Sequence, residues 1–283
     1  MPGINAEKPG SDDGAAQLHS AAWFGITPAN RKTIVVGNLP FDVLTLDDTV
    51  ERICAAVKSR TPLFLSTPNL SFVMAARGSA EFRQSVLSSD LSVADGGPIL
   101  WLARRQGTPL PERVAGADIF DALRFGAAQT HLGRPMRVFF FGGPEGVAEK
   151  ACQVLNQEAV DTHYMEGVGA IYPGHGSVED MSSQAWIDQI NASGADFLVV
   201  ALGARKGQAW IMANRHRLQV PVVSHLGAVV NFVAGTVSRA PRPLRRMGLE
   251  WLWRIKEEPE LFNRYWQDGK GLIQLWWHTK RGL

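Results

Sequence analysis

The residues best suited to chemistry in this sequence are Asp95 and the two glycines that follow it, Gly96 and Gly97. Residues 91–94 have the apolar composition of a short buried strand, and an apolar helix is predicted to begin at Pro98. A carboxylate and a glycine turn at the carboxyl end of a strand lie where open α/β sheets place their ligands. Asp95 is therefore the candidate catalytic carboxylate, although the pattern equally allows a simple cap for the helix that follows.

Two other turns offer groups that could bind a ligand. Thr67 and Asn69 follow an apolar strand predicted at 62–66, and Gly142 and Gly143 separate a strand at 137–141 from a helix at 145–155. Backbone N–H groups at the start of a helix favour phosphate. The alternatives are a local side-chain turn at Thr67 and Asn69, and a glycine pair that only allows the chain to enter the helix.

The usual nucleotide and metal motifs are missing from the sequence. It has no Walker A pattern, no G-x-G-x-x-G after a predicted strand, no Asp-x-Asp pair and no cluster with metal-ligand spacing. We therefore predict no metal and no cofactor, so a departing diphosphate would be neutralised by basic side chains and helix ends. The candidates are Arg113, Lys206, Arg239, Arg242, Arg254 and Arg264. Each could instead be a solvated surface charge.

The elements that must position these residues alternate between strand and helix from Thr33 to about Gly235. Such alternation predicts an α/β fold with a mostly parallel sheet and helices on both faces. Residues 1–30 lack any hydrophobic period and are predicted to be a disordered extension. The expected domains are thus this extension, an α/β core at 31–240 and a helical appendage at 241–283.

The appendage differs from the core in charge. From Arg239 onward there are ten Lys and Arg against five Asp and Glu, and five of the nine tryptophans lie there. A basic, Trp-rich segment suggests an anionic partner, either a membrane surface, a phosphate or a nucleic acid. No nucleic-acid-binding module is recognised, so nucleic acid is not expected. Two distant cysteines, Cys54 and Cys152, fit a reducing compartment.

An ordered set of motifs resembles the bacterial WecG/TagA/CpsF glycosyltransferase family, over residues 33–268. The motifs are TPN at 67–69, DG at 95–96, ERVAG at 112–116, FFFGG at 139–143, DFLVVALGARKGQ at 196–208, LGAVVNFVAG at 226–235, SRAP at 238–241 and GLEWLWRI at 248–255. The resemblance implies a Rossmann-like fold and an inverting transfer of sugar from a UDP-sugar to a polyprenyl-diphosphate-linked sugar. It also implies a peripheral location at the cytoplasmic face of the bacterial inner membrane, with the appendage as active-site lid and membrane contact.

The resemblance assigns the catalytic aspartate to Asp95 and the T-x-N residues to Thr67 and Asn69. With the candidates above, the predicted substrate-binding set is Thr67, Asn69, Gly96, Arg113, Gly142, Gly143, Lys206, Gln208, Arg239, Arg254 and Arg264.

Two positions depart from the family pattern. Gly207 stands where a glutamine is usual, so the role of that glutamine is lost or taken by Gln208, and Asn231 stands where aspartate is common. Both resemble the exopolysaccharide branch, with glucosyl or related hexosyl transfer, more than the N-acetylmannosamine branch. The donor sugar, the acceptor, the linkage and the oligomeric state, including a homo-oligomer, stay open. The rival functions are a nucleotide-dependent oxidoreductase and a non-catalytic scaffold of a polysaccharide assembly complex at the membrane.

Overall fold

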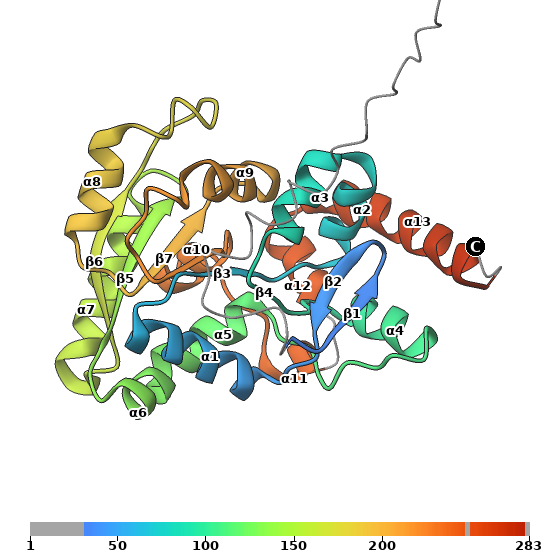
Figure 1. Cartoon of the computed structure of the whole chain (residues 1–283), viewed down its shortest axis with the longest axis horizontal. Helices are drawn as coiled ribbons and strands as arrows, with labels where there is room; N and C mark the ends of the chain where they lie inside the picture. The colour runs from blue at the N-terminus through green and yellow to red at the C-terminus, as the bar shows by residue number, and fades with distance from the viewer. Residues whose placement is uncertain (1–30, 247–249, 281–283) are drawn as a thin grey trace, which may run out of the picture.

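The computed structural model describes residues 31–246 and 250–280 of the 283-residue chain (Figure 1). The extension predicted at 1–30 lies outside the described residues. Six parallel strands form one sheet in the order β4-β3-β8-β7-β5-β6. They are β3 (Leu63–Ser66), β4 (Leu91–Ser92), β5 (Met136–Gly142), β6 (Met165–Ile171), β7 (Phe197–Ala201) and β8 (Val222–His225). The α/β fold predicted from the sequence is confirmed.

Both faces of the sheet are buried under helices, and the side chains of the central strands alternate between the two faces. Val138 and Phe140 of β5 belong to one apolar core, whereas Phe139 and Phe141 belong to another. The first core is covered by α1 (Leu46–Ser59), α5 (Gly116–Ala122), the kinked segment η2 (Leu123–Ala127), α6 (Ala128–Leu132), α7 (Val147–Thr162) and α10 (Val229–Ala234). The second is covered by α8 (Gln184–Ala192) and α9 (Ala204–Asn214).

A third core lies beyond β4 and supports the candidate catalytic segment. It joins the antiparallel hairpin of β1 (Thr33–Val36) and β2 (Leu39–Asp42) to three helices, α2 (Leu70–Gly78), α3 (Ala80–Leu87) and α4 (Gly97–Arg105). Asp42, at the end of β2, accepts a hydrogen bond of 2.7 Å from the backbone N–H of Ser92. This bond connects the hairpin to β4, the strand that leads to Asp95.

The predicted appendage consists of three helices in its described part, α11 (Arg242–Arg246), α12 (Glu250–Glu257) and α13 (Leu261–Lys280). Figure 1 shows α13 running past α2 on the side of the molecule away from β6 and α7. The Ser71 hydroxyl on α2 donates to the Asp268 carboxylate on α13, and Gly271 lies against the Met74 side chain. The appendage therefore folds back over the core at the end of the sheet where the strands terminate.

Candidate active site

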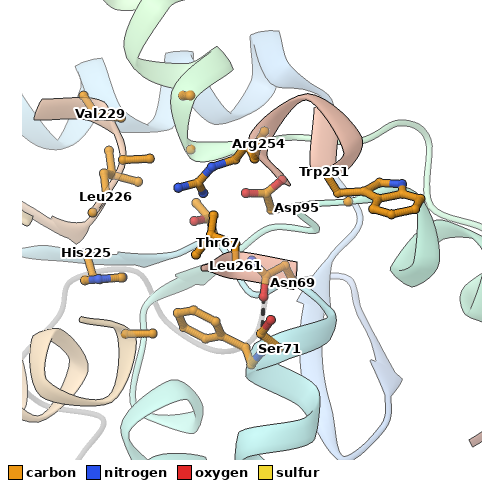
Figure 2. A pocket seen from close by; sticks show the side chains of 18 of the residues that line it. Thr67, Asn69, Ser71, Asp95, His225, Leu226, Val229, Trp251, Arg254 and Leu261 are labelled. Carbon is orange, nitrogen blue, oxygen red and sulfur yellow. Dashed lines mark hydrogen bonds between the residues drawn. The ribbon is translucent and has the colours of Figure 1, made fainter. Parts of the chain in front are cut away.

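A cavity of about 1000 Å³ lies between the carboxyl ends of the parallel strands and the appendage (Figure 2). Its floor is formed by the segments that follow β3, β4, β5, β7 and β8, from Thr67, Asp95, Gly143, Leu202 and Leu226 onward. Its roof is formed by α12 and α13. The carboxyl edge of an open parallel sheet is the usual position of a ligand site in this architecture.

Asp95 is held at the cavity by an extension of the sheet beyond the end of β4. Regular pairing stops at Ser92, two residues earlier than predicted, but Val93 N–H still donates to Ser66 O at 3.0 Å and Asp95 N–H to Pro68 O at 3.1 Å. Gly96, whose φ of 117° favours glycine, then starts α4 without any side-chain cap. The helix-cap alternative for Asp95 is therefore wrong, and its carboxylate remains available to the cavity.

The surroundings of Asp95 favour a carboxylate that can hold and release a proton near neutral pH. Its side chain is 29% exposed, and Arg113 Nη1 lies 3.7 Å from its Oδ1. Burial raises the pKa of Asp95 to about 7, the Arg113 guanidinium lowers it, and the Glu250 and Asp118 carboxylates raise it further. A general base acts best when its pKa is near the working pH.

Arg113 also belongs to an ion-pair network that joins the core to the roof. It pairs with Asp118 of α5 at 2.5 Å and with Glu250 of α12 at 3.2 Å. Arg239 pairs with Asp118 and with Asp121 of α5, and Arg245 of α11 lies 3.2 Å from Asp118. Arg239 does not line the cavity, because its guanidinium is turned to these carboxylates.

Two other predicted arginines line the cavity from the roof. Arg254 of α12 pairs with Glu258 at 2.7 Å, and the guanidinium of Arg264 on α13 lies 5.1 Å from the ring centre of Tyr265. Figure 2 shows Arg254 above the cavity, with Asp95 and Thr67 beside it. A negatively charged ligand in the cavity would meet these two guanidinium groups.

Thr67 and Asn69 also lie where they were predicted, on the cavity wall below Asp95. Thr67 is 8% exposed. Asn69 Oδ1 accepts from the Phe72 N–H at 3.2 Å and so caps the start of α2, which is a helix cap and not the local turn of the alternative. Because Asn69 also lines the cavity, its amide nitrogen can donate to a ligand.

The other predicted ligand residues divide into two groups. Gly96, Arg113 and Gly143 line the cavity. The other three, Gly142, Lys206 and Gln208, do not line it. A Cβ at Gly142 would lie 2.9 Å from Ala201 O, so this glycine packs closely against β7. Lys206 Nζ donates to Gly176 O at 2.7 Å, and the amide nitrogen of the buried Gln208 donates to Ser66 Oγ at 3.1 Å. The structure thus places these three in contacts within the protein.

Several lining residues carry polar groups that the sequence patterns missed. They are Ser71, Tyr172, His175, His225, Glu250, Glu258, Tyr265 and Asp268. Glu250 stands within the GLEWLWRI motif and His225 directly precedes LGAVVNFVAG, so a motif search extended to flanking polar residues would have found both.

Neither a metal cluster nor a membrane span is found in the part of the chain that the structure describes. No group of three or more His, Cys, Asp or Glu side chains there has the arrangement to hold a metal ion. None of the described helices combines the length and apolar character needed to cross a bilayer.

A doubly wound α/β fold with a large cavity at the carboxyl edge of its sheet defines a class of proteins that bind nucleotide-like ligands there. Within that class, residues 34–282 match the profile described as the glycosyl transferase WecG/TagA/CpsF family. The chain belongs to this family, and the resemblance seen in its motifs is confirmed.

Similar proteins carry a more specific name. Relatives from Staphylococcus aureus strains NCTC 8325 / PS 47 and COL are each named N-acetylglucosaminyldiphosphoundecaprenol N-acetyl-beta-D-mannosaminyltransferase. Each is 25% identical to this chain over 228 residues, which cover 80% of this chain and 85% of the relative.

Proposed function

We propose that this protein is an inverting glycosyltransferase that moves a sugar from a UDP-sugar onto a polyprenyl-diphosphate-linked sugar, with Asp95 as general base. The observation that carries the proposal is the Asp95 carboxylate, which lines a large cavity at the sheet edge with a pKa of about 7. The relatives' name, which specifies a diphosphoundecaprenol-linked acceptor, supports the acceptor class.

The mechanism needs one proton transfer and one displacement. Asp95 accepts the proton of the acceptor hydroxyl while that oxygen attacks the anomeric carbon of the donor. The bond from that carbon to the UDP oxygen breaks on the opposite face, so the configuration inverts. Arg254 and Arg264 lie on the roof where they can stabilise the negative charge that develops on the departing diphosphate. Thr67 and the Asn69 amide would hydrogen-bond the substrate beside Asp95.

The donor sugar has two candidates. The relatives' name favours N-acetylmannosamine. Gly207 and Asn231, which depart from the family pattern, favour glucose or a related hexose and a role in exopolysaccharide synthesis. Asn231 lines the cavity and Gly207 lies in the helix that follows β7, so both positions are close enough to the site to affect the donor.

We also propose that the outer face of α12 and α13 rests on the inner leaflet of the membrane that holds the lipid-linked acceptor. Its large apolar side chains are strongly exposed, with Phe262 53%, Trp266 58% and Ile273 58% exposed. Basic side chains accompany them, since Lys270 Nζ lies 5.5 Å from the Trp266 ring centre. Aromatic and basic side chains together favour the headgroup layer of an anionic bilayer.

The membrane proposal is tested with vesicles. The double variant Phe262→Ser/Trp266→Ser should lose most of its binding to vesicles that contain anionic lipid, as measured by co-sedimentation. A matched control is Val160→Ser, which replaces an apolar side chain that is 73% exposed on α7, on the opposite side of the molecule from α13 (Figure 1). Equal binding by both variants would contradict the proposed membrane face.

The activity is tested with a donor screen. The purified protein is offered UDP-glucose, UDP-N-acetylmannosamine, UDP-glucuronate and UDP-galactose, each with a short polyprenyl-diphosphate-sugar acceptor, with and without EDTA. We expect transfer from one donor, and its persistence in EDTA would support a metal-independent reaction. NAD(P) binding without transfer would favour an oxidoreductase, and biological complementation by Asp95→Asn would favour a scaffold.

A further inference from the structure

A histidine ring occupies space beside the cavity that the absence of a side chain at Gly207 leaves open. His225 ends β8 and lines the cavity, and a Cβ built at Gly207 of α9 would overlap the Cδ2 atom of its ring. Even the smallest side chain at 207 would therefore displace the imidazole. Gly207 and His225 form one structural unit, in which the glycine allows the histidine to reach the site.

The protonation state of His225 follows from its contacts. Its Nε2 lies 2.5 Å from Leu202 O, and a carbonyl oxygen only accepts, so Nε2 carries the proton. Burial lowers the pKa of His225, which keeps the ring neutral at physiological pH. Nδ1 is then an acceptor, and no residue in the described part of the chain donates to it. An acceptor on the wall of a cavity favours a ligand that can donate.

Gln208 was the expected substitute for the family glutamine, but it does not reach the cavity. It is 1% exposed, and its amide nitrogen donates to Ser66 Oγ beneath the site. His225 is thus the polar side chain that lines the cavity at this place, between β7 and the end of β8.

We propose that His225 is a specificity-determining residue for the donor, and that its Nδ1 accepts a hydrogen bond from an O–H or N–H of the sugar that UDP carries. This inference rests on the proposed function. Strands β4 and β8 flank β3, so their ends lie roughly 10 Å apart. Asp95 follows β4 and His225 ends β8, and both line the cavity, so the acceptor hydroxyl at Asp95 and the donor sugar beside His225 can occupy the same edge of the sheet.

Two variants separate the ligand contact from the structural contact. In His225→Gln the amide nitrogen can still donate to Leu202 O, but the acceptor at the Nδ1 position is lost. In His225→Asn the amide oxygen stands near the Nδ1 position, and the bond to Leu202 O is lost. The full-length variants are titrated by calorimetry with UDP, UDP-glucose and UDP-N-acetylmannosamine, and thermal melting shows whether each is folded.

We expect the wild type to bind one UDP-sugar more tightly than UDP. His225→Gln should weaken that UDP-sugar about three- to tenfold, the range of one neutral hydrogen bond, and leave UDP unchanged within about twofold. His225→Asn should keep most of the preference. The inference would be overturned if His225→Gln kept the wild-type preference for the UDP-sugar over UDP. It would also be overturned if both variants lost this preference equally. A wild type that binds neither UDP nor any UDP-sugar would instead overturn the proposed function.

The contact between Gly207 and His225 provides a second test. Gly207→Ala alone should displace the ring and lose the donor preference as His225→Gln does. In a His225→Ala background the same substitution should have no further effect, so the two changes form a strongly non-additive cycle. Gly207→Ala with unchanged donor preference would show that the ring does not act from this position.

Discussion

The floor and the roof of the cavity are held by different forces. On the floor, β5 and β7 are built from side chains that exclude water completely, with Phe140 and Val199 both 0% exposed. On the roof, α12 has no buried residue, and its contacts with the core are polar: Glu250 pairs with Arg113 and Arg239, and Trp253 Nε1 donates to Ser238 O. Apolar burial positions Asp95, whereas ion pairs position α12 above it.

This difference determines how each half responds to a ligand. Apolar burial contributes about 25 cal/mol per Å² and hardly depends on salt, while a partly exposed ion pair contributes about 1 kcal/mol or less and weakens with ionic strength. A charged substrate can therefore compete for the roof arginines without disturbing the floor. Asp95, the proposed general base, lies on the rigid half, and the arginines proposed to meet the diphosphate lie on the adjustable half.

The largest expected effect comes from the floor. Asp95→Asn removes the proton acceptor and should lower the turnover number by about 10² to 10⁴, as for other general bases. Because burial raises the pKa of Asp95 to about 7, its ionised form destabilises the fold at pH 8, so the variant should melt no lower than the wild type. Near-normal turnover in a transfer assay would remove Asp95 from the mechanism.

The next largest effect is expected in the dependence of kcat/KM on pH. Only the ionised carboxylate accepts a proton, so kcat/KM should rise with pH and level off above about 7, with roughly a tenth of the plateau at pH 6. The groups that act on this pKa are Arg113 and Arg239, which lower it, and Glu250 and Asp118, which raise it. A profile that is flat between pH 5.5 and 8 would contradict the assignment.

Glu250→Gln tests the contact between roof and floor. Loss of its charge should lower kcat/KM about fivefold, because one anchor of α12 weakens, and should move the midpoint of the pH profile to lower pH, because Glu250 raises the pKa of Asp95. Glu257→Gln is the matched control, since Glu257 is an exposed carboxylate on the same helix. If both variants show the same kcat/KM and the same midpoint of the pH profile, the ion-pair network does not couple α12 to Asp95.

The smallest effect is expected from the apolar contact of α13. A Cβ at Gly271 would overlap Met74, whereas a Cβ at Gly269 meets no atom within 4 Å. Gly271→Ala should raise KM about two- to threefold by shifting α13 on α2, and Met74→Ala should relieve that effect. Gly269 lines the cavity, so Met74→Ala provides the control instead: if it does not relieve the rise in KM of Gly271→Ala, packing on α2 is unimportant.

Much of the fold could be predicted from local patterns. The strands predicted at 62–66 and 137–141 are β3 (Leu63–Ser66) and β5 (Met136–Gly142), and the helices predicted from Pro98 and at 145–155 are α4 and α7, each close to its predicted position. Strand β6 was missed because its sequence, MEGVGAI, contains two glycines and lacks the continuous apolar run of a buried strand. Gly167 and Gly169 are needed there since a Cβ would overlap Cys152 and Phe139.

The sequence by itself determined the α/β class, the family and the position of Asp95, because each of these depends on residues that are neighbours in the chain. Only the tertiary structure decided which polar groups face the cavity. Arg239 turns to α5, more than a hundred residues earlier in the chain, and Gln208 turns beneath the floor, while His225 enters the cavity through the space above Gly207. A charged or polar side chain takes the partner that folding brings near, and sequence spacing alone does not contain that partner.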